Sequence, residues 1–209
     1  MIEHIDAECG RIFKTIRDIK LEKDTYIIFT TDNGPWLSFK NHGGSAGPLR
    51  AGKGTTFEGG QRVPFIIWRP GSIPAGKTSD ALVSSMDLLP TIATLSGYPL
   101  KPNNKIDGLD VSTVLTQTKA SPRTEFLHYS SRGSIEGIRQ GDWKLLIQKP
   151  RRKSKDKKTT AMLFNLAEDL GEQNNLAEKH PERVAQLTKR MQELDAEITE
   201  NARPVFGKK

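Results

Sequence analysis

The chain has 209 residues, of which 35% are hydrophobic and 27% are charged. These proportions are typical of a polar globular protein with one large domain or two small ones. No stretch approaches the apolar length that a membrane-spanning helix needs, and the charges spread through residues 1–20 exclude the apolar core of a signal peptide there. We therefore expect no membrane partner.

The net charge of +7 comes mostly from one segment. Residues 149–158 hold seven cations and one aspartate, so they carry six of the seven net positive charges. The segment has no aromatic side chains on which bases could stack, and the rest of the chain is nearly neutral. We interpret it as a solvated loop and expect no nucleic-acid partner.

The first part of the chain predicts a helix and two strands around a long loop. Apolar residues recur at three- and four-residue steps through residues 2–20, which is typical of an amphipathic helix. Residues 25–30 and 63–68 are short apolar runs without polar alternation, as expected of strands buried on both faces of a mostly parallel sheet. Residues 34–62 between them are rich in glycine and lack periodicity, and a long ordered loop of this kind is usually functional.

A helix is predicted next over residues 80–96, with Asp87 as a candidate cap, Pro90 in its first turn and Gly97 at its end. The composition then changes near residue 118. Four short strands are predicted at residues 125–130, 134–140, 142–148 and 161–166, with the basic segment as the hairpin loop between the third and fourth. A final helix begins at Pro181 and presents one apolar face.

These elements predict an α/β fold in two parts. Residues 1–118 form a partial, mainly parallel central sheet with helices. Residues 119–209 form a small antiparallel sheet covered by the C-terminal helix.

Asp32 and Asn33 directly follow the first predicted strand. Side chains at the end of a parallel strand project into the crevice where open α/β sheets bind ligands. A carboxylate and an amide oxygen are hard donors that suit Ca²⁺ or Mg²⁺. The alternative is an ordinary turn, in which Asp32 and Asn33 bond the local backbone.

Lys53 lies between Gly52 and Gly54, so both its backbone and its ammonium group can approach an anion closely. The segment before it nearly matches a Walker A loop, but Gly54 stands where that loop needs Ser or Thr, which argues against a nucleotide site. The alternative for Lys53 is a mobile surface side chain.

Four further residues of this loop are candidates for a role at the site: Trp36, His42, Glu58 and Arg62. His42 could hydrogen-bond an anion or simply be exposed. Trp36 could stack on a sugar ring or serve in packing. Glu58 and Arg62 could pair with each other or brace the loop that carries Lys53, and we favour the bracing role.

Taken together, these segments resemble the sulfatases of the alkaline phosphatase superfamily, in the branch that is similar to arylsulfatase A and N-acetylgalactosamine-6-sulfatase. The resemblance rests on long stretches of the sequence: TYIIFTTDNGPW, GGSAGPLRAGKGTTFEGGQRVPFIIWRPG, SSMDLLPTIATLSGYPL, DGLDVSTVL, GIRQGDWKLLI and LFNLAEDLGEQNNLAE. The ordered pair of DNGP and GKGTTFEGG is its most specific part.

The resemblance implies hydrolysis of sulfate esters on a partial alkaline-phosphatase-like sheet. Asp32 and Asn33 would be two ligands of a Ca²⁺ ion, in preference to Mg²⁺. Lys53 would be catalytic by binding a sulfate oxygen, and His42 would be a second substrate-binding residue. The substrate would be a sulfated small molecule or a sulfated sugar. Such enzymes are commonly exported, which leaves the compartment of this chain open.

The chain departs from the family in one respect that concerns the chemistry. Sulfatases attack with a formylglycine made in a Cys/Ser-x-Pro-x-Arg motif, and neither the sequence around Cys9 nor that around Ser121 matches it. We therefore expect this chain to be the C-terminal portion of a sulfatase and to be inactive alone. Its missing partner would be an N-terminal half of the same protein. Two alternatives stay open: a non-catalytic truncated domain, and a phosphatase or phosphodiesterase relative.

Overall fold

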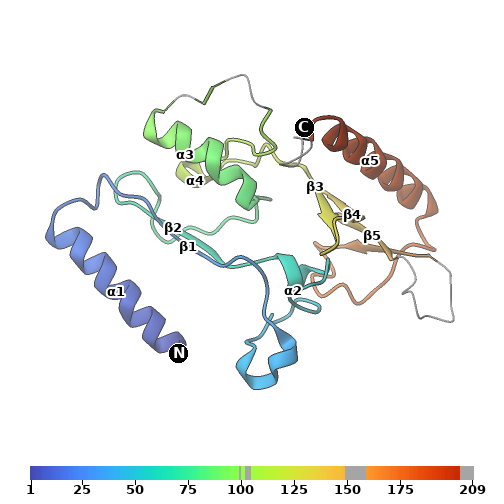
Figure 1. Cartoon of the computed structure of the whole chain (residues 1–209), viewed down its shortest axis with the longest axis horizontal. Coiled ribbons are helices and arrows are strands. Elements are labelled where there is room, and N and C mark those ends of the chain that lie inside the picture. Colours follow the sequence, from blue (N-terminus) through green and yellow to red (C-terminus); the bar gives the residue numbers. More distant parts are fainter. Residues whose placement is uncertain (99, 102–104, 149–158, 203–209) are drawn as a thin grey trace, which may run out of the picture. The chain divides into compact units, whose positions relative to one another are not determined.

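Figure 1 shows a computed structural model of the chain, which describes residues 1–98, 100–101, 105–148 and 159–202. The basic segment predicted as a hairpin loop, residues 149–158, lies outside the described residues. In chain order the elements are α1 (Ile2–Asp18), β1 (Ile27–Thr30), η1 (Leu37–His42), α2 (Glu58–Gln61), β2 (Phe65–Trp68), η2 (Ser85–Asp87), α3 (Leu88–Ser96), α4 (Ser112–Gln117), β3 (Glu125–Tyr129), β4 (Ile135–Gln140), β5 (Trp143–Gln148), β6 (Thr160–Asn165) and α5 (Pro181–Glu200). No described helix is long and apolar enough to span a membrane.

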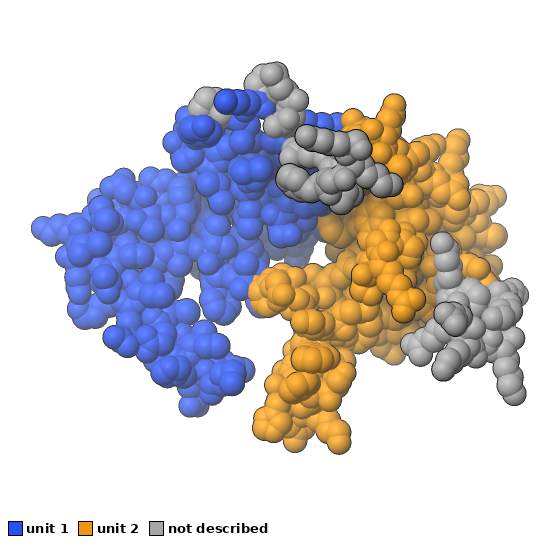
Figure 2. All heavy atoms as spheres, viewed as in Figure 1, with its two compact units in different colours: residues 1–30, 64–123 blue, residues 31–63, 124–209 orange. Residues whose placement is uncertain are grey.

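The described chain forms two compact units, coloured separately in Figure 2. The first unit contains residues 1–30 and 64–123, and the second contains residues 31–63 and 124–209. The division into a catalytic part, residues 1–118, and a C-terminal part, residues 119–209, stays a prediction. The glycine-rich loop, residues 31–63, belongs to the same compact unit as the C-terminal sheet.

Strands β1 and β2 of the first unit pair with each other in antiparallel register, from Ile27 opposite Trp68 to Thr30 opposite Phe65. The expectation of a mainly parallel sheet, buried on both faces, is therefore wrong for the described chain. Phe29 is 43% exposed and Ile66 is 59% exposed. A continuous apolar run indicates that a strand has two apolar faces, but it carries no information on the direction of the neighbouring strand.

Helix α1 is amphipathic, as predicted, and it contacts the rest of the first unit through few side chains. Phe13 meets Trp68 edge to face, with ring centroids 5.0 Å apart, and the Arg17 guanidinium lies 5.4 Å from the Trp68 ring centroid. Other members of its apolar stripe are exposed in the described chain, namely Ile2, Ile5, Ile12 and Ile19. The first unit thus leaves apolar surface uncovered on its helix and on its two-stranded sheet.

The predicted helix over residues 80–96 begins only at Leu88, after the short 3₁₀ turn η2. Ser84 is extended and forms a capping box, in which its backbone N–H donates to Asp87 Oδ2 at 2.8 Å. The Asp87 carboxylate is fully buried and also accepts bonds from the backbone N–H of Leu109 at 2.8 Å and from Arg123. This carboxylate therefore joins three separate segments of the first unit.

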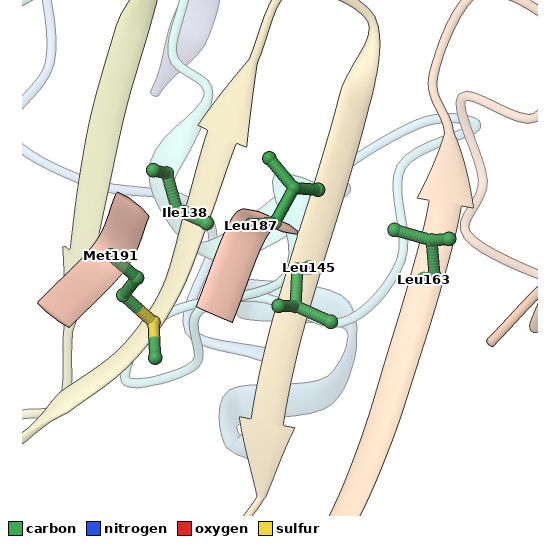
Figure 3. Packing of buried hydrophobic residues seen from close by; sticks show 5 residues of the cluster. All are labelled: Ile138, Leu145, Leu163, Leu187 and Met191. Carbon is green, nitrogen blue, oxygen red and sulfur yellow. The ribbon is translucent and has the colours of Figure 1, made fainter. Parts of the chain in front are cut away.

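The second unit is built on an antiparallel sheet in the order β3-β4-β5-β6, as the sequence predicted. Helix α5 covers one face of this sheet. Figure 3 shows the core between them, which consists of Ile138, Leu145, Leu163, Leu187 and Met191. Side chains along a strand alternate between faces, so Lys144 and Leu146 lie on the face opposite to Leu145.

The opposite face of the sheet packs against the glycine-rich loop. Phe57 from the loop forms a second apolar cluster with Leu146, Phe164 and Leu166. The sheet thus has a helix on one face and the loop with the predicted site residues on the other. This arrangement places the Lys53 region on a rigid support from the same unit.

The Asp87 carboxylate predicts a specific pH dependence of stability. Burial by itself raises the pKa of this carboxyl, but the hydrogen bonds from Arg123, Leu109 and Ser84 lower it below its ordinary value of 3.8. A lowered folded-state pKa stabilises the fold above the ordinary value, and the contribution is lost as the pH falls through the folded-state pKa. Asp87→Asn should cost about 3 kcal/mol of unfolding free energy at pH 7.

This difference between Asp87→Asn and the parent chain should shrink as the pH falls below the ordinary value, measured by urea unfolding from pH 7 to pH 3. The exposed Asp80 of the same unit provides the control variant Asp80→Asn. A difference that stays constant over this pH range would contradict the assignment to the Asp87 carboxylate.

Candidate functional site

Asp32 and Asn33 directly follow β1, as predicted. Asp32 is exposed and Asn33 is half-buried. The Thr31 hydroxyl lies 3.4 Å from both Asp32 Oδ1 and the carbonyl oxygen of Asn33, to which it can donate. The turn therefore presents a carboxylate at the surface with an amide beside it.

The two sequence motifs are joined by backbone hydrogen bonds. The N–H of Lys53 donates to the carbonyl of Pro35 at 2.9 Å, and the N–H of Gly34 donates to the carbonyl of Gly60 at 3.1 Å. A Cβ atom on Gly52 would lie 2.4 Å from the Pro35 oxygen, so only glycine fits there. The fold thus brings the segment with Asp32 and Asn33 to the segment with Lys53.

The Lys53 side chain is exposed, and its Nζ lies 5.6 Å from the centroid of the Trp36 ring. This distance is within the range of a cation–π interaction. Trp36 also packs on Phe39, with ring centroids 4.4 Å apart, and remains 52% exposed. A packing role of Trp36 is therefore present in the structure, while stacking on a sugar stays a prediction.

His42 ends η1 and is exposed. Within the described residues, no contact of its side chain with Asp32, Asn33 or Lys53 is found. The predicted role of His42 in substrate binding stays a prediction.

Glu58 braces the loop, which is the role that we predicted in preference to a pair with Arg62. Its Oε1 lies 2.8 Å from Nζ of Lys144, and its Oε2 lies 3.8 Å from Nη1 of Arg139. Lys144 is fully buried, as is Glu172, whose Oε1 lies 2.9 Å from the same Nζ. Burial raises the pKa of the Glu172 carboxyl, and the Lys144 ammonium opposes this rise.

Sequence reasoning missed Lys144, Glu172 and the role of His128. His128 Nδ1 bonds to Gln61 Oε1 at the end of α2, while Nε2 is buried without a hydrogen-bond partner among the described residues. Burial, and then the charges of Lys144 and Arg139, hold the pKa of His128 well below its ordinary value. The available signal was a lysine inside the apolar strand Trp143–Gln148.

The donors for a metal ion fit in type and are few in number. Asp32 and Asn33 offer hard oxygen atoms, which suit Ca²⁺ or Mg²⁺, but Ca²⁺ takes six to eight such ligands. In the described part of the chain, no group of three or more His, Cys, Asp or Glu side chains is placed to hold a metal ion. Among the described residues of this site, Asp32 and Asn33 thus offer two donors of the kind that calcium takes.

Family models match residues 1–198, and curated relatives match up to 97% of the chain. The model described as Sulfatase matches residues 1–98, and the model described as N-sulphoglucosamine sulphohydrolase, C-terminal, matches residues 52–198. Human arylsulfatase A is 39% identical over 97% of this chain and 43% of its own length. N-acetylgalactosamine-6-sulfatase from Sus scrofa is 44% identical over 61% of this chain and 24% of its own length.

Two solved structures share the fold. PsFucS1 sulfatase from Pseudoalteromonas sp. matches 98% of this chain and 43% of its own, with a TM-score of 0.82 and 28% identity. Ps i-CgsB, solved in complex with k-i-k-neocarrahexaose, matches 93% of this chain and 41% of its own, with a TM-score of 0.78 and 28% identity. The chain thus spans less than half the length of these relatives. From residue 1 to residue 198 the chain matches models of one family, and it belongs to the sulfatases.

Proposed function

We propose that this chain supplies the sulfate-binding lysine and two calcium ligands of a sulfuric ester hydrolase. The observation that carries this proposal is the pair of backbone hydrogen bonds that join the Asp32–Asn33 turn to the Lys53 loop. They hold a carboxylate, an amide and an ammonium group on neighbouring segments of one unit. That combination suits a doubly charged oxyanion next to a hard cation.

Each side chain has a distinct role in this proposal. Asp32 and Asn33 would hold Ca²⁺, which when bound neutralises negative charge on the sulfate. Lys53 stabilises the sulfate oxygens as they gain negative charge during cleavage of the ester bond. The exposed Gly54 leaves room for the ester to approach beside Lys53, whereas Gly52 makes room for the Pro35 carbonyl.

The substrate class is a sulfated sugar or an aryl sulfate. The names of the relatives support a sulfated sugar, since one is an N-acetylgalactosamine-6-sulfatase and one structure holds a neocarrahexaose. The half-exposed Trp36 next to Lys53 supports a ring-shaped substrate, because an indole can cover the apolar face of a ring while the lysine binds its sulfate.

The proposal requires groups that the 209-residue sequence does not hold. These groups are a formylglycine, whose Cys/Ser-x-Pro-x-Arg motif is absent from the sequence, and further metal ligands, of which the described residues place no cluster. An N-terminal half of the family fold would supply them, and the exposed apolar stripe of α1 and the exposed faces of β1 and β2 support such a partner. The second candidate function is a non-catalytic sulfatase-like domain, which the small number of metal donors favours.

Lys53→Ala should weaken the binding of inorganic sulfate at least about tenfold, because a hydrogen bond to a charged group contributes about 1.5–3 kcal/mol. The affinity can be measured by following amide shifts in a nuclear magnetic resonance titration of the 209-residue chain. The control is Lys189→Ala, which removes one positive charge from an exposed side chain on α5 of the same unit. Equal sulfate affinity in Lys53→Ala and Lys189→Ala would exclude Lys53 as the sulfate ligand.

Calcium should bind this chain weakly, with a dissociation constant of about 1 mM or higher, because two oxygen ligands are far fewer than a calcium site uses. Asp32→Ala should abolish the binding detected by calorimetric titration, and Mg²⁺ should compete poorly. Asp142→Ala, an exposed carboxylate of the same unit, should leave it unchanged. Calcium binding that survives in Asp32→Ala would place the ion elsewhere.

The purified chain should not hydrolyse 4-nitrophenyl sulfate, because it holds no formylglycine motif to provide the nucleophile. Turnover is measured by release of 4-nitrophenol, with 4-nitrophenyl phosphate in parallel. Hydrolysis of the sulfate ester that is lost in Lys53→Ala would mean that the chain is active alone. Hydrolysis of the phosphate ester alone would favour the phosphatase or phosphodiesterase alternative.

A further inference from the structure

The Lys144 ammonium lies in the interior of the second unit, on the sheet face that packs against the loop. It is fully buried, and a buried charge is costly unless it is paired and hydrogen-bonded. Its two partners are the carboxylates of Glu58, at 2.8 Å, and Glu172, at 2.9 Å. With Arg139 beside Glu58, the cluster contains two negative and two positive groups. Its charges are therefore balanced only while Glu58 stays on the sheet.

Glu172 ties the loop at a second point. Its Oε2 accepts a hydrogen bond from the backbone N–H of Glu58 at 2.7 Å. Its backbone carbonyl oxygen accepts a hydrogen bond from Nη1 of Arg50 at 2.6 Å. Glu172 has a positive φ of 52°, a conformation that costs energy in a residue other than glycine and persists where surrounding contacts enforce it. One residue of the C-terminal part thus contacts the loop on both sides of Lys53.

The loop between these two contacts is closed on itself. The N–H of Gly59 donates to the carbonyl of Arg50 at 2.9 Å, and the Arg50 guanidinium lies 4.0 Å from the Phe57 ring centroid. Lys53 therefore stands at the tip of a closed loop, residues 50–59, whose two ends both contact Glu172. Displacing Glu172 would remove one contact at each end, and displacing Lys144 would remove the ion pair of Glu58.

We propose that Lys144 and Glu172 are positioning residues, which act through Glu58 and Arg50 to hold Lys53 where it binds the sulfate group. Neither residue touches the sulfate. This inference rests on the proposed sulfate-binding role of Lys53 and adds to it the part of the chain that sets its position. The competing explanation is that the cluster only stabilises the fold of the second unit.

The test compares Glu172→Gln with Arg190→Met in the 209-residue chain. Arg190 forms an ion pair with Glu125 at 2.9 Å between α5 and β3, in the same unit as the cluster. Loss of this ion pair should destabilise the second unit while leaving the contacts between the loop and Glu172 in place. Urea concentrations are chosen so that the two variants have equal unfolding free energy, which removes global stability from the comparison.

The first readout is hydrogen exchange at the amides of Lys53 and Gly59. Both amides keep their acceptors, Pro35 and Arg50, in every variant, so faster exchange reports opening of the loop. In Glu172→Gln, exchange at these two amides should accelerate at least about tenfold more than in Arg190→Met, because a buried partner is left unsatisfied. Equal acceleration in the two variants would overturn the proposal.

The second readout is the affinity for inorganic sulfate, which should fall about tenfold in Glu172→Gln and stay unchanged in Arg190→Met. If the parent chain and Lys53→Ala bind sulfate equally, the proposed function fails, and the exchange data still decide whether Glu172 positions the loop. If sulfate binding depends on Lys53 but not on Glu172, the positioning role is wrong.

Lys144→Met leaves two buried carboxylates and can prevent folding. The variant Glu58→Gln/Lys144→Met/Glu172→Gln removes the three buried charges and leaves Arg139, which donates to the Gly141 carbonyl at 3.0 Å. Uncharged replacements of a buried ion cluster often retain stability. This variant should fold yet show the fast exchange at Lys53. A folded triple variant with parent-like exchange at Lys53 and Gly59 would also overturn the proposal.

Discussion

The balance of the buried Lys144 charge determines how the second unit is organised. One face of its sheet is apolar and accepts α5, while the other carries His128, Arg139 and Lys144. A loop that packs on this second face must bring carboxylates and amide groups with it. Glu58 and Gln61 of α2 do so, and this requirement fixes where the glycine-rich segment lies.

The glycine-rich segment meets a second, steric constraint at the other motif. Gly34 and Gly59 approach so closely that a Cβ atom on Gly34 would lie 1.8 Å from the Gly59 oxygen. The two motifs can therefore hydrogen-bond only because Gly34 and Gly52 carry no side chains, since a Cβ atom on Gly52 would meet the Pro35 oxygen. The charged contacts on one side and the bare backbone on the other together place Lys53 near Asp32 and Asn33 in one unit.

Those helices and strands that depend on residues close together along the chain could be predicted from the sequence. The short strands from residue 125 onward and the apolar face of α5 are local patterns, and the structure confirms them. The first unit was harder, because Phe29 and Ile66 suggested burial without indicating strand direction, and the pairing is antiparallel. The start of α3 was misplaced because the capping box of Ser84 and Asp87 outweighs the apolar pattern before it. The position of Glu172 beside Glu58 has no local signal, since it depends on contacts between distant segments.

Those distances along the chain have a consequence for biosynthesis. Glu58 and Glu172 are 114 residues apart, and Arg50 and Glu172 are 122 apart. A ribosome that adds about 5–20 residues per second needs roughly 6–23 s to pass from one glutamate to the other. During that interval the glycine-rich segment is already made but lacks both of its contacts with Glu172. The loop with Lys53 therefore becomes fully ordered only after residue 172 has been synthesised, and until then its glycines leave it open to proteases and to non-native contacts.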